Sequence, residues 1–600
     1  MGRQALRVNR DRPQSEILQA ALRTCRRHFV AAAVFSAFLN LLFLAPTLYM
    51  LQVYNRVVPA RSDLTLGFLT LVLVFALATL SMLDMVRSRL LVRASVKLDR
   101  ELSGVILDST LGRRTGGADG LTRQAMREFD TLRQNLTGAG VLALFDAPWT
   151  PIYILVCFML HPALGALCLL GAILLVALTW MNEQATRARL LRANSAANIA
   201  YVSQEDSASR SETVRALGMR HAMVQRHLEE RAQAAALQTE ANFAGSGYMA
   251  TTRFVRLGLQ SLALGLGAWL AVHQQISAGA IFAASFLVSR ALAPIEQVLG
   301  AWRGLVQARG AWRTLSEVLQ RPAVDIAVTR LPAPTGKIAV ESMGVANATR
   351  DGAILGGISF AADKGECIGV IGPSGAGKST LIRALVGAIA VDAGAIRYDG
   401  AEIRDYDPER LARHIGYMPQ EPSLFRGTVK DNIARFRHHM GEEELDERAI
   451  EAAKAAGAHE MILHLPHAYD TPLGFGGRGL SLGQAQRIAL ARALYGDPSI
   501  VALDEPNAHL DTEGEAQLME TLRGLKARGA TTLVVAHRPS VLPAFDKIMV
   551  LRDGRIELFG ARDEVIQRLA PKPVPRVTPA KPAASGKGEP PQPEFLRSRL

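Results

Sequence analysis

The sequence predicts an all-α membrane domain with six spans, followed by an α/β nucleotide-binding domain. Three observations support this fold class. The first 300 residues contain four long runs without a charged side chain. From residue 337 onward, short apolar runs alternate with amphipathic helical patterns, as expected for an α/β domain. One of those apolar runs leads into a glycine-rich loop of the phosphate-binding type.

The uncharged runs set the number of spans. They are residues 29–55, 64–83, 147–182 and 257–289. Because a helix needs about 20 apolar residues to cross a bilayer, each of the first two runs fits one span. The third and fourth runs are long enough for helical hairpins, with turns expected at His161-Pro162 and at residues 273–275. The total is six spans.

Lysine and arginine placement predicts the orientation. The chain carries 68 Lys and Arg against 55 Asp and Glu, a formal net charge of +13. Basic residues cluster before the first span, after the second and after the fourth, so these segments and both termini are predicted to be cytoplasmic. This placement accounts for much of the basicity without nucleic acid. No cleavable signal peptide is evident in residues 1–28, and residues 15–29 suggest an amphipathic helix on the membrane surface.

No acidic or basic residue lies inside the predicted spans, so the relay groups of ion-coupled transporters are absent and another energy source is expected. Between spans, residues 84–145 and 183–250 are charged, rich in Ala and Leu, and free of proline. About 34 residues of helix reach about 50 Å. These two segments therefore predict helices that project well beyond the bilayer and return.

Composition changes mark the domain boundaries. Residues 571–600 contain 8 prolines, and 6 Lys and Arg against 2 Asp and Glu, which predicts a disordered tail. The expected parts are a basic N-terminal segment (1–28), a transmembrane domain (29–320), a linker (321–336), a nucleotide-binding domain (337–568) and a proline-rich tail (569–600).

The glycine-rich loop has the spacing GxxxxGK[ST] between a predicted strand, residues 367–371, and a helix. Its backbone N–H groups can close around phosphate oxygens at a positive helix N-terminus. Lys378 is predicted to reach the β- and γ-phosphates, and the Ser379 hydroxyl to bind Mg²⁺. The predicted nucleotide-binding residues are Gly372, Pro373, Ser374, Gly375, Ala376, Gly377, Lys378, Ser379 and Thr380.

Two further predicted strands end in reactive side chains. Residues 500–503 lead into Asp504 and Glu505, and residues 532–536 lead into His537. Asp504 suits Mg²⁺ coordination, and Glu505 suits polarisation of the attacking water. His537 can contact the same phosphate. Three such strand ends in this order are unexpected by chance, and they predict an ATP hydrolase.

The remaining motifs resemble those of ABC transporter ATPases across residues 337 to about 568. Gln420 resembles the Q-loop, residues 480–484 the signature motif and residues 507–511 the D-loop. The resemblance implies a half-exporter that uses ATP and Mg²⁺, with Gln420 at the metal and the reacting phosphate. It also implies a homodimer, because Ser481, Gly483 and Gln484 of one subunit complete the nucleotide site of the other.

The membrane half resembles type I secretion permease/ATPases at residues 48–59, 145–151, 215–219 and 277–294. The similarity is to the branch that exports metalloproteases, lipases and S-layer proteins and has no N-terminal peptidase domain. The resemblance implies export of an unfolded polypeptide with a C-terminal signal across a bacterial inner membrane. A periplasmic adaptor, an outer-membrane channel and membrane lipid are the implied partners, and nucleic acid is not.

Three positions depart from the family pattern. Asn347 stands where an aromatic side chain usually stacks on adenine, and losing such a stack costs roughly 1–3 kcal/mol. Leu482 replaces a usual glycine, at roughly 1–2 kcal/mol if the backbone there requires positive φ. Ala485 replaces a usual arginine. We expect weaker or less adenine-selective nucleotide binding.

Two other functions fit parts of the sequence. An exporter of lipid or of a small amphipathic molecule has the same architecture, and only the resemblance of the membrane half argues against it. A nucleotide-gated membrane receptor or channel would bind ATP without hydrolysing it. Glu505 and His537 argue against that second function because both are hydrolytic residue types.

Overall fold

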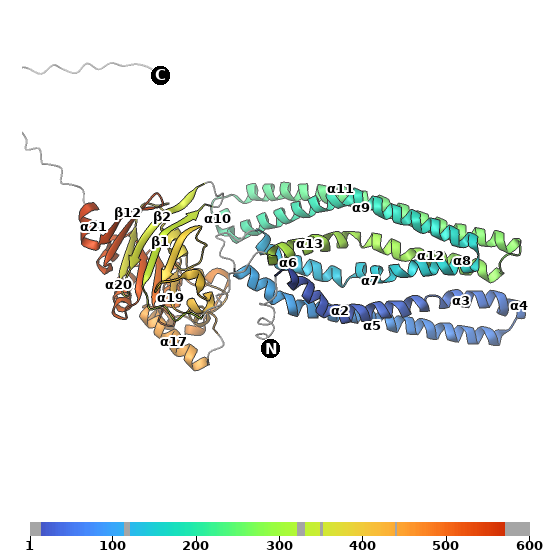
Figure 1. Cartoon of the computed structure of the whole chain (residues 1–600), viewed down its shortest axis with the longest axis horizontal. Helices are drawn as coiled ribbons and strands as arrows, with labels where there is room; N and C mark the ends of the chain where they lie inside the picture. The colour runs from blue at the N-terminus through green and yellow to red at the C-terminus, as the bar shows by residue number, and fades with distance from the viewer. Residues whose placement is uncertain (1–13, 113–119, 321–329, 348–351, 438–440, 570–600) are drawn as a thin grey trace, which may run out of the picture. The chain divides into compact units, whose positions relative to one another are not determined.

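The computed structural model describes residues 14–112, 120–320, 330–347, 352–437 and 441–569, and it separates into two compact units, residues 1–325 and 326–600. The first unit is helical and the second contains the sheets (Figure 1). Most of the predicted linker and nearly all of the predicted tail lie outside the described residues.

The helical unit contains six segments long and apolar enough to cross a membrane, counted over the described residues, which confirms the predicted number. Its helices are α2 (Gln14–Leu42), α3 (Ala45–Gln52), α4 (Val58–Ala60), α5 (Asp63–Leu111), α6 (Gly120–Leu136), α7 (Ala139–Asp146), α8 (Thr150–Leu160), α9 (Pro162–Ser209), α10 (Ser211–Ala216), α11 (Arg220–Val272), α12 (Ala278–Gly300) and α13 (Trp302–Gln320). A π-helical turn, Val53–Val57, joins α3 to α4, and a 3₁₀ turn, Ala147–Trp149, joins α7 to α8.

Both predicted hairpin turns are confirmed. Helix α8 ends at Leu160, and the His161 side chain caps α9 by accepting a hydrogen bond from the Ala163 N–H at 3.1 Å. Pro162 fits the first position of α9 because the missing N–H would have no partner there. The second turn separates α11, which ends at Val272, from α12, which begins at Ala278.

The expectation of a helix lying on the membrane surface before the first span is wrong for the described residues. Helix α2 runs without a break from Gln14 to Leu42. Its apolar stripe, Ile17, Leu18, Ala21 and Cys25, is buried against apolar side chains of α5, α6 and α13. Protein helices therefore cover the surface that the amphipathic pattern had suggested for lipid.

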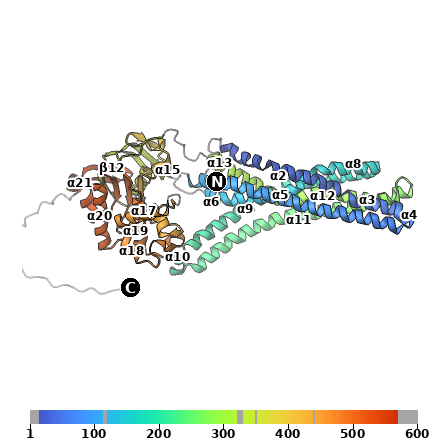
Figure 2. The same cartoon turned by 90° about the horizontal axis from the view of Figure 1, so that it is seen from below.

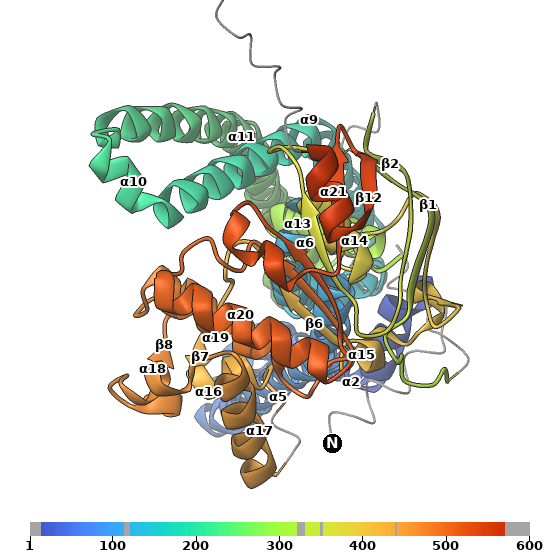
Figure 3. The ribbon, with the colours of Figure 1, turned by 90° about the vertical axis from the view of Figure 1, so that its left-hand side faces the viewer.

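The predicted long helices are present. Helices α5, α9 and α11 contain 49, 48 and 53 residues, so each is about 75 Å long, well over twice the apolar thickness of a bilayer. Helices α9 and α11 run side by side in both Figures 1 and 2. The short helix α10 joins them at one end, as Figure 3 shows.

Charged residues next to the uncharged runs meet inside the helical unit. The Arg87 guanidinium on α5 donates to Asp146 on α7 at 3.1 Å and to Ser36 on α2 at 2.9 Å. Arg87 and Asp146 are both buried. A second nitrogen of Arg87 donates to Asp84 at 2.7 Å. The uncharged runs are joined at their ends by a buried ion pair, but the sixth apolar helix, α12, itself carries Arg290 and Glu296, so the expectation of spans without charge is wrong for that helix.

Two uncharged groups extend this network. The Asn40 amide donates to Asp146 at 2.8 Å, and the Tyr153 hydroxyl donates to the Asn40 carbonyl at 2.7 Å. Asn40 and Tyr153 are fully buried. The network therefore connects α2, α5, α7 and α8 around the 3₁₀ turn that interrupts the third span.

The α/β unit is built on a six-stranded sheet with the order β12-β11-β3-β10-β9-β6. All of these strands run parallel except β12, which is antiparallel to β11. They are β3 (Cys367–Ile371), β6 (Ile415–Met418), β9 (Ile500–Asp504), β10 (Thr531–Val535), β11 (Lys547–Arg552) and β12 (Arg555–Ala561). Alternate residues of the central strands belong to two separate apolar cores, so both faces of the sheet are covered.

A four-stranded antiparallel sheet with the order β2-β1-β4-β5 accompanies it. Its strands are β1 (Ile338–Ala346), β2 (Ala353–Ala362), β4 (Ala393–Tyr398) and β5 (Ala401–Glu402), and β7 (Gly427–Thr428) pairs with β8 (Pro472–Leu473). The helices are α14 (Lys378–Leu385), α15 (Pro408–Leu411), α16 (Val429–Ile433), α17 (Glu442–Ala455), α18 (His459–Leu463), α19 (Leu482–Leu494), α20 (Thr512–Ala527) and α21 (Arg562–Leu569).

The buried ion pair leads to a stability prediction. Asp146→Leu removes the buried partner of Arg87 and leaves it only the half-exposed Asp84, so we expect the free energy of unfolding to fall by up to roughly 3–5 kcal/mol. The double variant Arg87→Met/Asp146→Leu should lose less, because it leaves no isolated charge. Thermal unfolding of the detergent-solubilised protein measures both. Asp99→Leu is the control, since Asp99 forms a more exposed ion pair with Arg133 at 3.7 Å. A single variant no worse than this control would contradict the prediction.

Candidate active site

The parallel strands bring the predicted site residues to one edge of the sheet. Strand β3 leads into the phosphate-binding loop, residues 372–380, and β9 ends at Asp504. His537 comes two residues after the end of the neighbouring strand β10, and Gln420 comes two residues after β6. Because these strands are parallel neighbours, their carboxyl ends lie together, as in other open α/β sheets that bind ligands there.

Two glycines make the loop conformation possible. Gly372 has φ +152°, and a Cβ there would lie 2.1 Å from the Leu551 carbonyl oxygen. Gly377 has φ +94° at the N-terminus of α14, and a Cβ there would lie 2.6 Å from a methyl group of Leu355. A side chain at either position would force the loop away from the sheet, so the glycine spacing follows from steric limits.

Lys378 is held inside this loop. Its Nζ donates to the carbonyl oxygens of Gly372 at 2.9 Å and Pro373 at 2.8 Å. Burial lowers the pKa of Lys378, and the nearby carboxylates of Glu505 and Asp504 oppose this shift. The ammonium therefore has two neutral partners that a triphosphate can replace with stronger, charge-assisted ones.

Asp504 provides the test of whether a divalent cation fits. Its side chain is fully buried, and neither carboxylate oxygen has a hydrogen-bond partner among the described residues. Burial raises the pKa of Asp504, while the nearby Ser379 hydroxyl opposes the rise. A buried carboxylate with free oxygens beside a hydroxyl is the oxygen donor set that Mg²⁺ uses in nucleotide sites, so these residues fit the ion.

Glu505 and His537 form a direct contact. His537 Nε2 lies 2.9 Å from a carboxylate oxygen of Glu505, and the His537 side chain is partly exposed. The Glu505 backbone is left-handed, with φ +51°, which is uncommon outside glycine. Its N–H donates to the Val535 carbonyl of β10 at 3.2 Å. Two neighbouring strands thus fix both candidate hydrolytic residues.

The signature motif forms the first turn of α19. The Ser481 side chain accepts a hydrogen bond from the Gln484 N–H at 3.3 Å, and the Gln484 side chain accepts one from the Ser481 N–H at 2.9 Å, which is a capping box. This turn also contains Gly483. Among the described residues it forms no hydrogen bond to the phosphate-binding loop.

The departures from the family pattern have different structural outcomes. Leu482 begins α19 and has no positive φ, so the condition for its expected strain is not met. Ala485 is buried in the core beneath α19, where an arginine would need space. Asn347 directly follows β1 and its N–H donates to the Gly352 carbonyl at 2.8 Å, while residues 348–351 lie outside the described parts.

Gln486 is a residue that sequence analysis missed. It is buried on α19, and its side-chain amide donates to the Glu505 carbonyl at 3.1 Å. The available signal was a second glutamine two residues after the signature residue Gln484. That signal is weak because buried glutamines serve many structural purposes.

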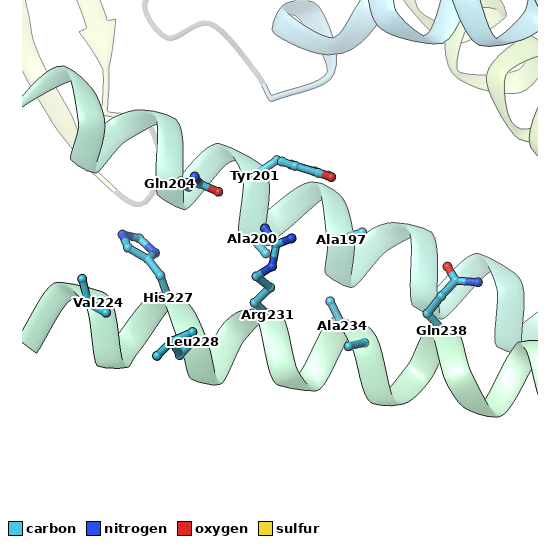
Figure 4. Close-up of a pocket in the computed structure, with 11 residues that line it drawn as sticks. Ala197, Ala200, Tyr201, Gln204, Val224, His227, Leu228, Arg231, Ala234 and Gln238 are labelled. Carbon is cyan, nitrogen blue, oxygen red and sulfur yellow. The ribbon is translucent and has the colours of Figure 1, made fainter.

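A cleft of about 510 Å³ lies between α9 and α11, outside the α/β unit (Figure 4). Tyr201 and Gln204 of α9 line it together with His227 and Arg231 of α11. His227 also contacts Ser207 of α9 at 3.0 Å. The cleft mixes alanine, amide and basic side chains, and none of the predicted nucleotide-site residues lines it.

Comparison with known proteins identifies the class first. The ABC transporter transmembrane region family matches residues 29–292, and the ABC transporter family matches residues 355–508. The fold is similar to that of a bacterial Atm1-family ABC exporter solved with ATP bound, with a TM-score of 0.79 over 90% of this chain and 96% of that one, at 23% identity. The chain belongs to the ABC transporter family.

The similar proteins then indicate a branch within this family. The chain is 40% identical to the type I secretion system ATP-binding protein PrsD of Rhizobium meliloti, over 94% of this chain and 97% of that protein. It is 30% identical to the cyclolysin secretion/processing ATP-binding protein CyaB of Bordetella pertussis, over 90% and 76% of the two chains. It is 29% identical to the α-hemolysin translocation ATP-binding protein HlyB of Escherichia coli O157:H7, over 90% and 77%.

Asp504 leads to a prediction that separates stability from activity. Asp504→Asn removes a buried carboxylate, so we expect the nucleotide-free protein to unfold about 1–4 °C higher, while hydrolysis is lost. Because folding raises the pKa of Asp504, the gain should be largest at neutral pH and vanish at acidic pH, where the carboxyl is neutral in both states. Scanning calorimetry against pH measures this. Asp511→Asn, at an exposed carboxylate, should show no such gain.

Asn347 leads to a prediction about nucleotide selectivity. Without an aromatic stack, the protein should bind ATP and GTP with similar affinity, and Asn347→Tyr should tighten ATP binding by about 5- to 140-fold. Equilibrium binding of fluorescent nucleotide analogues, competed with ATP or GTP, measures both. Strongly adenine-selective binding by the unmodified protein would contradict the prediction.

Proposed function

We propose that this protein is the ABC component of a type I secretion system, and that it uses ATP to export an unfolded polypeptide with a C-terminal signal. One combination of observations carries the proposal. Six apolar spans and a full set of strand-end ATPase residues occur in one chain, and that chain aligns over nearly its whole length with proteins named for type I secretion.

The proposed working unit is a homodimer. Among the described residues no hydrogen bond joins the signature turn to the phosphate-binding loop, and in the proposal a second copy completes each site. In this arrangement Lys378 and Ser379 of one subunit bind the triphosphate, and Ser481 and Gly483 of the partner copy close over it. When bound, Mg²⁺ neutralises charge on the phosphate oxygens, and Ser379, Gln420 and Asp504 are the residues expected to hold it.

Hydrolysis requires an oriented water and a stabilised leaving phosphate. In the proposal Glu505 polarises the water. His537, which lies 2.9 Å from Glu505, contacts the γ-phosphate once nucleotide separates the two. Closure and reopening of the dimer would reach the spans through α5, α9 and α11. Each is a single helix that continues from its apolar stretch into a long polar extension.

The proposed location is the bacterial inner membrane, with both termini in the cytoplasm. Basic residue placement supports this orientation, and the apolar stretch of α5 has no buried residue in one chain, which suits contact with lipid or a second copy. A periplasmic adaptor and an outer-membrane channel are the proposed partners. The lipid-exporter alternative has no specific observation in its favour, and the geometry of Glu505 and His537 argues against a receptor that only binds ATP.

Glu505→Gln tests the mechanism. The change keeps the shape of the side chain but removes its ability to polarise water, so we expect steady-state phosphate release to fall by about 10²–10⁴-fold while ATP still binds. Phosphate release and nucleotide retention on the purified protein measure the two effects. Normal hydrolysis by this variant would reject the assignment.

The same variant tests the cargo. A dimer held closed by unhydrolysed ATP should retain its partners, so affinity purification of Glu505→Gln from membranes should recover an adaptor together with a polypeptide. A peptide with the C-terminal sequence of that polypeptide should change the ATPase rate of the unmodified protein, and a scrambled peptide should not. Recovery of lipid alone would favour the alternative exporter.

A further inference from the structure

Gln486 lies between the signature motif at the start of α19 and the loop that contains Glu505. It lies on α19, about one turn after the signature residues Ser481 and Gly483, and its side chain is 1% exposed. A buried amide without partners is costly, so its contacts indicate what the fold uses it for.

The two ends of this amide bind different parts of the catalytic loop, the segment that contains Glu505 and the D-loop residues 507–511. Its Nε2 donates to the Glu505 carbonyl at 3.1 Å, and its Oε1 accepts from the His509 N–H, also at 3.1 Å. A carbonyl can only accept and an N–H can only donate, so the partners fix the orientation of the amide. One side chain therefore joins the signature helix to Glu505 and to the D-loop, residues 507–511.

The Glu505 backbone is in a conformation that needs such support. A left-handed φ of +51° costs free energy for any residue with a Cβ and persists only where its surroundings fix it. The N–H is held by Val535, and the carbonyl accepts from both Gln486 and the Ala508 N–H. Removing the Gln486 contact leaves only one local turn bond on that carbonyl.

The loop also has a polar group without a partner. Asn507 is 2% exposed, and its side-chain nitrogen has no hydrogen-bond partner among the described residues. A second side-chain contact from α19 is the ion pair of Arg487 with Asp511 at 3.2 Å. It is more exposed and contributes little to the stability of the loop. Among the described residues, Gln486 thus makes the buried hydrogen-bonded connection between α19 and this loop.

We propose that Gln486 is a positioning residue that sets the backbone of Glu505 according to the position of the signature helix. This inference rests on the proposed roles of Glu505 and of the signature motif. When the Ser481 end of α19 engages the nucleotide bound by the partner copy, Gln486 passes that displacement to the Glu505 and D-loop of its own subunit. Nucleotide binding at one site thus changes the position of Glu505 at the other site through this one amide.

Gln486→Met tests the proposal, because methionine keeps the length and packing of the side chain but cannot form either hydrogen bond. In the full-length protein we expect kcat to fall by about 10- to 100-fold, as for a small misplacement of a catalytic group, with the Kd for ATP changed by less than about twofold. Gln486→Glu keeps the acceptor for His509 but loses the amide donor to Glu505, and should show the same pattern.

A double-mutant cycle separates positioning from a general structural role. If Gln486 acts through Glu505, then Gln486→Met should slow the residual hydrolysis of Glu505→Gln by less than about twofold. Equal slowing in both backgrounds would overturn the proposal, as would a parallel loss of ATP affinity. Normal hydrolysis by Glu505→Gln alone would reject the role of Glu505, and the proposal with it.

Gln517→Met is the matched control. Gln517 lines the same small crevice as Gln486, from α20, and its side chain lies against Gly457. We expect its kcat to stay within about twofold of the unmodified protein. Thermal unfolding of the variants at Gln486 and Gln517 identifies any that fail to fold. A Gln486 variant that folds normally and keeps full kcat would also overturn the proposal.

Discussion

The parallel alignment of β3, β10, β9 and β6 is the constraint on which the active site depends. Each strand ends at the same edge of the sheet, so the phosphate-binding loop, Asp504, His537 and Gln420 meet there although they are spread over 166 residues of sequence. The apolar cores on both faces hold the strands in this register. The unsatisfied carboxylate of Asp504 and the strained backbone of Glu505 exist because that framework fixes them.

The helical unit follows a different constraint, the continuity of long helices. Helices α5, α9 and α11 cross from apolar to polar surroundings without a break, so a force at one end is carried to the other. Where the third span is broken at Ala147–Trp149, the buried network around Arg87 and Asp146 joins the surrounding helices. The ion pair of Arg87 with Asp146 thus joins the ends of neighbouring uncharged runs.

Prediction from the sequence was correct for features that a local sequence pattern determines. The two hairpin turns, the six spans and the strand-loop-helix context of Lys378 follow from hydrophobic runs and glycine spacing alone. It failed for residues 15–29, because an amphipathic stripe does not reveal whether lipid or protein will cover it, and here α5, α6 and α13 do. The cost expected at Leu482 also depended on a backbone angle that the sequence does not contain, and the helix start removes it.

The sequence by itself determined the chemistry of this protein, because phosphate binding and water polarisation need particular residue types at strand ends, and those are visible as short motifs. Only the tertiary structure decided how these groups are held. The contact of Glu505 with His537, the ion pair of Arg87 with Asp146 and the bridge made by Gln486 each join residues from different elements. Such contacts arise from packing between elements, and no spacing along the chain encodes them.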